Sequence, residues 1–301
     1  GLTIRSILAH ASGLPAWLPL GHRLWEQHPD TVPGSHEAKR LIRGWIQSEV
    51  AKLPIQNTAT TPTYSDIGYI VLGWWFESRF KQSLDELIKS RVLTPWHLTS
   101  TRFVGTNEWT SGDSPLANFS AATELCPIRK RVIVGQVHDE NAFALGGVCG
   151  HAGLFSTADD VGKWADHLLN SYYGFGPVKQ ETVKLFWTTG GRFSQNDTRG
   201  HFGNKISPAD LGTWRLGWDT PSVTGSSGGN NIPRDAVGHL GFTGCSVWIV
   251  PSLCATVVLL SNRVHPTRNN DAIKTFRPAL HNLIWDIVRQ TTPQQNKFSS
   301  S

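Results

Sequence analysis

The sequence contains no methionine and little cysteine. No methionine occurs in its 301 residues, not even at position 1, and the four cysteines are Cys126, Cys149, Cys245 and Cys254. No two of them form a Cys-x-x-Cys pair, which leaves zinc-ribbon and thioredoxin-like proteins without support. Cys245 and Cys254 flank a predicted turn at Pro251 and could pair if the hairpin register allowed it, but free buried thiols are the simpler expectation.

Long apolar runs and long basic runs are also absent. The sequence has no signal peptide and no stretch of ~18 apolar residues that could span a bilayer. The net charge of +5 is scattered, without a run of five Lys or Arg, so we expect no nucleic-acid partner. The chain opens on GLTIRSILAHASGLP, which reads like the middle of a domain. We therefore expect an N-terminally truncated chain, with any membrane anchor or export signal in the missing N-terminus.

The composition is that of a folded globular protein, because 39% of the residues are hydrophobic and 17% are charged. Apolar residues at helical spacing, preceded by polar caps, predict helices. The predicted caps are Ser35, Ser65 or Asp66, and Thr157 or Asp159. The predicted helices cover residues 35–53, 65–80, 83–93, 157–170 and 272–290.

The last third of the chain contains the predicted strands. An apolar run over 235–250 and a second one over 254–262 are joined by a turn at Pro251–Ser252, and a short strand is predicted at 214–220. Helices first and antiparallel strands later predict an α+β fold. We expect one domain over residues 1–292 and a disordered tail over 293–301.

Tyr64 precedes the second of these helices, in the stretch TYSDIGYIVLG. Residues at a helix start project into the space lined by the preceding loop, and the helix dipole there favours negative charge. A tyrosine near cations loses its proton more easily and can act as a base. The structural alternative is a buried tyrosine followed by a Ser-Asp helix cap.

The stretch DAVGHLGFTGCSVWIV contains His239, Gly241, Thr243 and Gly244 where a buried strand would carry packing residues. Glycines inside a strand let a ligand or another backbone approach closely. Their N–H groups can then point at a substrate oxygen, as an oxyanion hole requires, with His239 as a donor or a positive charge. The structural alternative is a glycine-rich β-bulge with a structural histidine.

Together these stretches resemble the serine β-lactamase and penicillin-binding-protein superfamily, in its branch of esterase-like and D-alanyl-peptide-cleaving hydrolases. The resemblance implies a β-lactamase/transpeptidase-like fold, an antiparallel sheet flanked by helices plus a helical region, without its N-terminal part. The matching segments keep the family's order between Leu2 and Pro266: LTIRSILAHASGLPAW, YSDIGYIVLG, HDENAFALGGVCGHAGLFSTADDV, GHLGFTGCSVWIVP and VVLLSNRVHP.

The resemblance also implies catalytic roles. Tyr64 would be the general base and acid, and Asp66 would stand where an asparagine usually orients the catalytic lysine and the substrate. His239 would replace the lysine of the third motif, and the Phe242 N–H, just past Gly241, would form half of the oxyanion hole. Tyr64 and His239 would then face each other across one groove.

The nucleophile that the resemblance requires is missing. In the family it is the serine of a Ser-x-x-Lys motif upstream of the LTIRSILAHASGLP segment, and this chain begins after that point. Its one Ser-x-x-Lys, Ser78–Lys81, lies at the end of the helix after Tyr64, in the wrong order. Because the acyl-enzyme route needs that nucleophile, we expect residues 1–301 alone to be inactive.

A histidine-rich segment allows a rival interpretation as a hydrolytic metal site, formed by His138, Asp139, Glu140 and His151. Adjacent side chains point in different directions, and no His-Glu-x-x-His or His-x-His spacing occurs. We therefore predict no metal and no organic cofactor.

Substrate-binding residues are predicted in two places. His138, Asn141 and His151 are expected to line or brace the site, and Thr243 and Leu240 belong to the third motif. Leu240 stands where the family often has a threonine whose hydroxyl helps bind a substrate carboxylate. Its presence favours neutral esters or amides.

The resulting hypothesis is a serine hydrolase that acts through an acyl-enzyme on esters, amides or D-Ala peptides. The alternative is a non-catalytic relative that binds a peptide or a glycan. In both cases the partner is a small molecule or a peptide. Kinship with exported relatives implies the periplasm or the cell envelope, and the sequence leaves the oligomeric state open.

Overall fold

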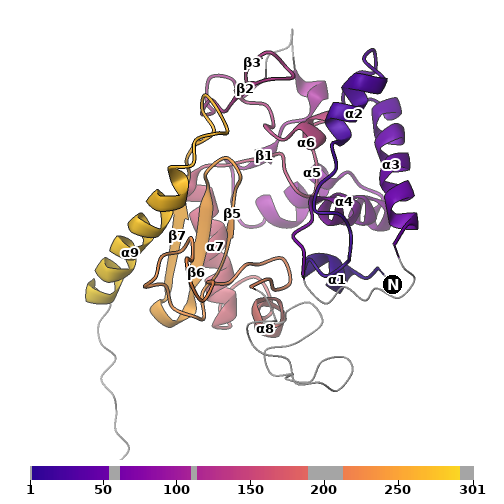
Figure 1. The fold of residues 1–301 in the computed structure, drawn as a ribbon. Coiled ribbons are helices and arrows are strands. Elements are labelled where there is room, and N and C mark those ends of the chain that lie inside the picture. The colour runs from indigo at the N-terminus through magenta and orange to yellow at the C-terminus, as the bar shows by residue number, and fades with distance from the viewer. Residues whose placement is uncertain (1, 54–61, 110–113, 189–212, 292–301) are drawn as a thin grey trace, which may run out of the picture.

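A computed structural model describes residues 2–53, 62–109, 114–188 and 213–291. Helices from the first half of the chain lie on one side of the molecule, and an antiparallel sheet with long helices lies on the other (Figure 1). This order of helices and strands confirms the α+β class. The predicted tail 293–301 lies outside the described residues, and the extent of the domain stays a prediction.

Three helices begin at predicted caps. In each, a serine or threonine side chain accepts a hydrogen bond from the backbone N–H three residues further on, which satisfies a donor that the first helical turn leaves free. The caps and helices are Ser35 before α3 (His36–Ala51), Ser65 before α4 (Asp66–Phe80) and Thr157 before α7 (Ala158–Tyr172).

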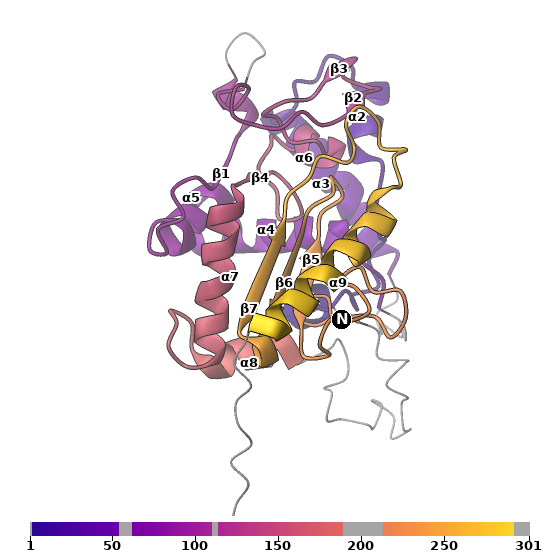
Figure 2. The same cartoon turned by 90° about the vertical axis from the view of Figure 1, so that its left-hand side faces the viewer.

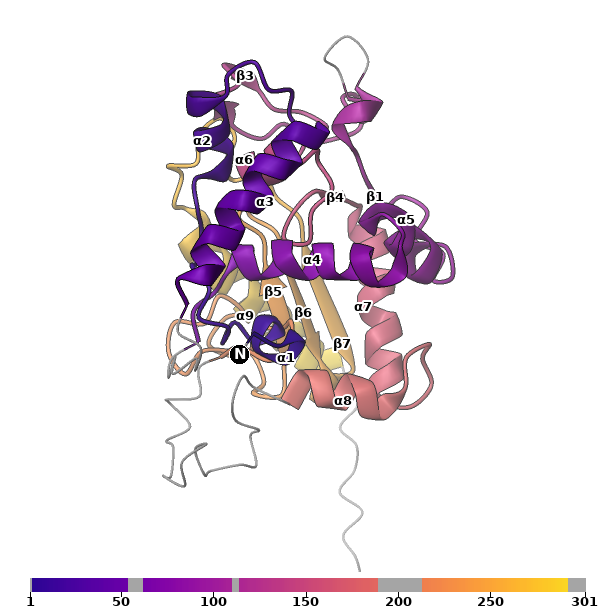
Figure 3. The same cartoon turned by 90° about the vertical axis from the view of Figure 1, so that its right-hand side faces the viewer.

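The other helices connect and cover these. The helix predicted over 83–93 is split into α5 and a short π-helix, Lys89–Leu93. Figure 3 shows α3 and α4 on the side of the molecule opposite the last helix, α9. The remaining helices are α1 (Ile4–Leu8), α2 (Leu20–Gln27), α5 (Leu84–Ile88), α6 (Glu140–Ala144), α8 (Gln180–Thr188) and α9 (Ile273–Thr291).

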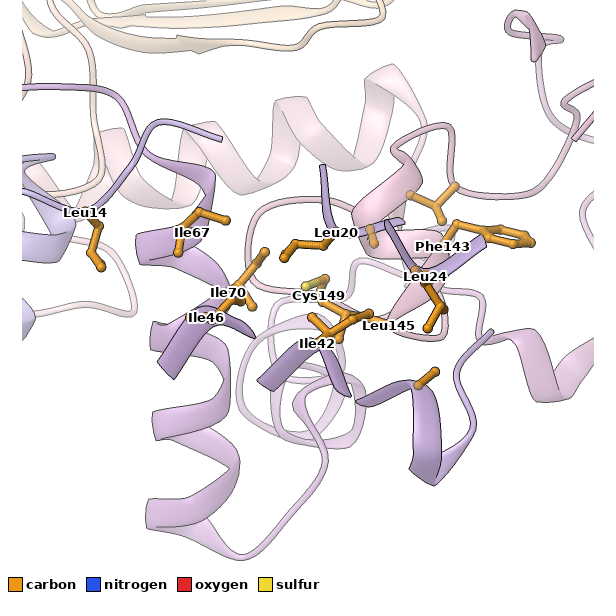
Figure 4. Packing of buried hydrophobic residues seen from close by; sticks show 14 residues of the cluster. Leu14, Leu20, Leu24, Ile42, Ile46, Ile67, Ile70, Phe143, Leu145 and Cys149 are labelled. Atoms are coloured by element: carbon orange, nitrogen blue, oxygen red, sulfur yellow. The ribbon is translucent and has the colours of Figure 1, made fainter. Parts of the chain in front are cut away.

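The helical half has its own hydrophobic core. Ala38, Ile42 and Ile46 lie on one face of α3, because residues four apart return to the same side of a helix. They pack against Ile70 of α4, and Figure 4 shows Cys149 among these side chains. Each of these isoleucine side chains contributes about 1.5–3 kcal/mol when fully buried. This core holds the loop around Cys149 against the start of α4.

The sheet consists of β5 (Val237–Leu240), β6 (Ser246–Val250) and β7 (Ala255–Leu259), antiparallel and in that order. The expectation of one strand through the first apolar run is wrong, because residues 241–245 form a turn between β5 and β6. Gly244 has φ +119°, a conformation that side chains rarely adopt and that reverses the chain there. The predicted turn at Pro251–Ser252 is a short 3₁₀ helix, Pro251–Leu253.

Helices cover both faces of this sheet (Figure 2). Trp248 and Val250 point to one face and pack against Trp285 of α9. Val237 and Ile249 point to the other face and pack against α7 and α8. Since His239 lies two residues from Val237 on β5, the alternation of strand side chains places His239 on the α7 side, at the end of the strand.

Short strand pairs complete the described fold. They are β1 (Arg102–Phe103) with β4 (Leu154–Phe155), and β2 (Leu125–Cys126) with β3 (Arg131–Val132). The strand predicted at 214–220 is wrong, since this segment has only isolated bridge residues, among them Asp219 paired with Gly238.

The four cysteines are free thiols in the structure. The free state agrees with the simpler expectation for Cys245 and Cys254, but the expected burial is wrong, because Cys245 is half-buried and Cys254 is exposed. Over the ranges given above, no helix is both long and apolar enough to cross a membrane.

Candidate functional site

Tyr64 is held in place by the backbone around the start of α4. The Ser65 hydroxyl accepts from the Gly68 N–H at 3.1 Å and donates to the Pro15 carbonyl at 2.6 Å. The Ser65 N–H donates to Nδ1 of His10 at 3.0 Å. The phenol ring of Tyr64 is 40% exposed, so its position is fixed while its ring stays accessible to a ligand.

His10 lies beneath Tyr64 as a buried, neutral imidazole. Its ring centroid is 4.6 Å from that of Tyr64 and 5.1 Å from that of Tyr69. Because Nδ1 accepts the Ser65 N–H, it carries no proton. Burial, assisted by the nearby His239, lowers the pKa of His10 to about 4. His10 therefore acts as a packed hydrogen-bond acceptor at neutral pH.

The low pKa of His10 predicts acid-sensitive stability. In the unfolded chain a histidine has a pKa near 6.5, so below that pH the unfolded state takes up a proton that the native state refuses. The stability contribution is complete above pH 6.5 and is lost as the pH falls toward 4. Between pH 7 and pH 5 we expect the free energy of unfolding of the wild type to fall by about 2 kcal/mol more than that of His10→Gln.

Urea unfolding at the two pH values, followed by tryptophan fluorescence, measures this difference. The exposed His36 provides the control, since His36→Gln should keep the pH dependence of the wild type. If His10→Gln also kept that dependence, the neutral buried imidazole would be the wrong description of His10.

His239 faces Tyr64 from the end of β5. Their ring centroids are 6.2 Å apart, and Trp214 lies against both rings, at 5.2 Å from Tyr64 and 5.7 Å from His239. Nδ1 of His239 lies 2.8 Å from the Leu240 carbonyl oxygen, which can only accept. Nδ1 therefore carries the proton in this bond, which leaves Nε2 as the nitrogen for a ligand.

Asp66 extends the site on the other side of Tyr64. Asp66 lies close enough to Tyr64 for its charge to act on the phenol. Burial and the charge of Asp66 raise the pKa of Tyr64, and burial raises the pKa of Asp66 although His151 opposes that rise. At neutral pH Tyr64 is therefore a protonated phenol, and the expectation that it loses its proton more easily is wrong.

A buried ion pair lies next to Asp66. Nε2 of His151 is 2.9 Å from Oδ1 of Asp139. Burial disfavours the imidazolium, but contact with Cys149 and the bond to Asp139 outweigh it and hold the pKa of His151 well above its ordinary value. The same bond keeps the pKa of Asp139 low against the effect of burial. His151 and Asp139 both act on the carboxyl group of Asp66, in opposite directions.

The turn after β5 presents the Gly241–Phe242 peptide. The Gly241 N–H donates to the Cys245 carbonyl at 2.7 Å, and the Gly244 N–H donates to the Gly241 carbonyl at 3.0 Å. The Phe242 N–H makes no hydrogen bond to any residue that the structure describes. It has the unpaired state that an oxyanion donor requires.

His138 supports this turn from below. Its ring stacks on Phe242 with centroids 5.8 Å apart, and its Nε2 lies 2.9 Å from Oε2 of Glu124. Arg268 bridges Glu124 and Glu140, at 2.6 and 2.5 Å. Burial would raise the pKa of Glu124, but the bonds from Arg268 and His138 outweigh it and lower that pKa to about 2.

Three predicted substrate-binding residues point elsewhere. Leu240 packs on the sheet face under α9, away from His239. The amide of buried Asn141 accepts from the Gly21 N–H and donates to the Leu18 carbonyl, so it braces the start of α2. The Thr243 hydroxyl lies 3.7 Å from Cys245 Sγ, within the turn. Side-chain contact of these residues with a substrate stays a prediction that their placement does not favour.

The rival metal interpretation gains no support from the described residues. They contain no cluster of three His, Cys, Asp or Glu side chains suited to an ion. Asp139 binds His151, whereas His138 and Glu140 take part in the Arg268 network instead.

His10 and Trp214 are the site residues that the sequence analysis did not single out. His10 lies in the LTIRSILAHASGLPAW segment, so the resemblance marks its segment but not its contact with Tyr64. No sequence signal distinguishes Trp214 from the other tryptophans, because its position against two distant rings exists only in the folded chain.

Comparison with known proteins finds a matching family model and similar proteins. A family model described as beta-lactamase matches residues 1–279. A protein of Escherichia coli K12, named as a D-alanyl-D-alanine carboxypeptidase, is 32% identical over 284 residues, which cover 88% of this chain and 57% of that protein. The chain thus spans little more than half the length of that relative.

Solved structures show the same fold. Unliganded simvastatin synthase from Aspergillus terreus has a TM-score of 0.59 at 16% identity, covering 96% of this chain and 69% of the other. The octameric penicillin-binding protein homologue from Pyrococcus abyssi has a TM-score of 0.58 at 18% identity, covering 94% and 56%. With the family match, these confirm the predicted fold.

Proposed function

Because the chain belongs to the beta-lactamase family, we propose that its site is that of a serine hydrolase acting through an acyl-enzyme. The observation that carries the proposal is the approach of Tyr64 and His239, with ring centroids 6.2 Å apart, beside the unpaired Phe242 N–H. A proton carrier, a second polar ring and an oxyanion donor are the groups that acyl transfer needs around a nucleophile.

Tyr64 moves the proton in this scheme. A serine Oγ attacks the carbonyl carbon and gives its proton to the Tyr64 oxygen. The Tyr64 hydroxyl proton moves to the leaving oxygen or nitrogen as the bond of that atom to the carbonyl carbon breaks, so the phenol stays protonated. Water then attacks the acyl-serine, which releases the acid and restores the hydroxyl. The charge of Asp66 disfavours the phenolate, so Tyr64 keeps one proton before and after each transfer.

The nucleophile is proposed to come from a Ser-x-x-Lys motif outside residues 1–301. Ser78 cannot supply it, because it lies twelve residues along α4 from Asp66, or about 18 Å at 1.5 Å per residue. Residues 1–301 alone are therefore proposed to be inactive.

The proposed substrates are esters, amides or peptides ending in D-Ala. The relative in Escherichia coli carries a name for D-alanyl-D-alanine cleavage, which supports the peptide class. Leu240 supports uncharged substrates, because neither its side chain nor its position offers a donor for a carboxylate. We further propose that the protein acts in the periplasm or the cell envelope, without a metal or an organic cofactor.

Acylation of the full-length protein tests the proposal. We expect stoichiometric labelling by a fluorescent penicillin or burst hydrolysis of a p-nitrophenyl ester, and neither with residues 1–301 alone. An ester panel measured against D-Ala-D-Ala peptides then ranks the substrate classes. Full-length protein that is folded but neither labelled nor hydrolytic would overturn the hydrolase, and calorimetric binding of a peptide or glycan would then support the non-catalytic alternative.

A further inference from the structure

One buried arginine holds the turn that carries the oxyanion donor. Arg277 of α9 is 8% exposed, and one of its terminal nitrogens donates to the Gly241 carbonyl at 3.0 Å and to the Cys245 carbonyl at 2.7 Å. Its Nε has no partner among the described residues. The guanidinium is thus turned toward backbone carbonyls at both ends of the turn.

This placement is energetically unfavourable for a merely structural residue. Burial lowers the pKa of Arg277, which shows that its charge is poorly solvated there. Burying an ion is expensive unless it is paired, and carbonyl dipoles compensate less than a carboxylate does. Residues whose placement is unfavourable for stability, such as a buried charge without a counter-ion, are found mainly at functional sites.

The turn does not need Arg277 for its closure. The Gly241 N–H bond to Cys245 and the Gly244 N–H bond to Gly241 already close it through the backbone. Arg277 adds a charge-assisted hydrogen bond to the Gly241 carbonyl. The effect of Arg277 should therefore fall on the peptide unit between Gly241 and Phe242.

The Gly241 carbonyl and the Phe242 N–H belong to the same peptide unit. In a planar trans peptide they point in opposite directions, so fixing the carbonyl toward α9 fixes the N–H away from it. A positive donor on the carbonyl oxygen also polarises the unit, which strengthens its N–H as a donor.

We propose that Arg277 is a positioning residue that aims and strengthens the Phe242 N–H for an oxyanion. The proposal rests on the hydrolase function proposed above. Arg263 provides an internal comparison, because its Nε donates to the Phe242 carbonyl at 2.9 Å and therefore acts on the next peptide unit.

Spectroscopy tests this effect without requiring activity. In full-length protein labelled with ¹⁵N-phenylalanine, we expect the Phe242 amide proton to move upfield in Arg277→Met, because it becomes a weaker donor. Arg277→Lys should restore most of the shift, since its ammonium can still donate to the Gly241 carbonyl. Arg289→Gln, on the same helix, should leave it unchanged, because Arg289 donates to the Asn231 carbonyl instead.

Kinetics provides the second measurement. We expect Arg277→Met to lower kcat for p-nitrophenyl esters by about 10-fold with little change in KM, a fraction of the 10²–10³ loss for complete removal of an oxyanion donor. Arg277→Lys should recover most of kcat. A structural defect would instead lower the active fraction and would not be rescued in this way.

The two measurements separate the possible failures. The role of Arg277 would be overturned if the Phe242 resonance of Arg277→Met were unchanged. It would also be overturned if the wild type were active and Arg277→Met had the same kcat. If Arg277→Met fails to fold, an Arg277→Lys variant with wild-type kcat and resonance supports the proposal, and one that folds but has lost both overturns it. A wild type without hydrolysis would refute the hydrolase function alone, because the resonance still reports on Arg277.

Discussion

Replacing Tyr64 with phenylalanine is expected to lower kcat/KM of the full-length protein toward p-nitrophenyl esters by about 10²- to 10⁴-fold, the usual range for a lost general acid–base. The substitution removes the hydroxyl that relays the proton and leaves the ring contacts with His10, Trp214 and His239. The packing should therefore survive while the proton has no carrier. Steady-state and burst kinetics measure the loss.

Tyr69 offers a matched control. Its ring also stacks on His10, at 5.1 Å, but its hydroxyl is engaged in a bond to the Leu8 carbonyl at 3.1 Å. Tyr69→Phe should stay within a small factor of the wild type. Equal losses in the two variants would mean that the phenol of Tyr64 matters for packing and not for proton transfer.

Gly150→Ala is expected to destabilise the protein by about 3 kcal/mol or more, at the upper end of overpacking effects. A Cβ at this position would lie 2.1 Å from the Tyr69 carbonyl oxygen and 3.3 Å from the Gly73 N–H nitrogen. These are backbone atoms of α4, which cannot move without breaking the helix. Urea unfolding followed by tryptophan fluorescence measures the change.

Gly162→Ala controls for the general effect of replacing glycine. A Cβ at Gly162, within α7, meets nothing within 4 Å, so alanine should stabilise the protein by about 0.5–1 kcal/mol through helix propensity. A Gly150→Ala variant as stable as the wild type would show that the loop before His151 can retreat from α4, contrary to the close approach described here.

Local features of the fold are the ones that the sequence predicts well. Ser35, Ser65 and Thr157 cap the predicted helices because a cap depends on residues within one turn. The strand prediction through residues 241–245 fails, because apolar content does not report the backbone reversal that Gly244 allows. Hydrophobic periodicity indicates which residues are buried more reliably than where the chain turns.

Some residues of the candidate site can be predicted from sequence motifs, and others are recognised only in the tertiary structure. The motifs point to Tyr64, Asp66 and His239, which the fold brings together. Trp214 contacts both rings only through tertiary structure, and Arg277 reaches its turn from a helix more than thirty residues later. Leu240 faces the α9 side because strand residues alternate, so its motif position alone misplaces it.

The ionic network of Glu124, Glu140 and Arg268 has a consequence for how the protein is made. Arg268 is 144 residues after Glu124 and 128 after Glu140, so a ribosome releases the two carboxylates long before their cation. Until then, burial of two like charges opposes closure around His138. We therefore expect nascent chains to complete the network of Arg268, Glu124 and Glu140 only after the strand with His239 has emerged.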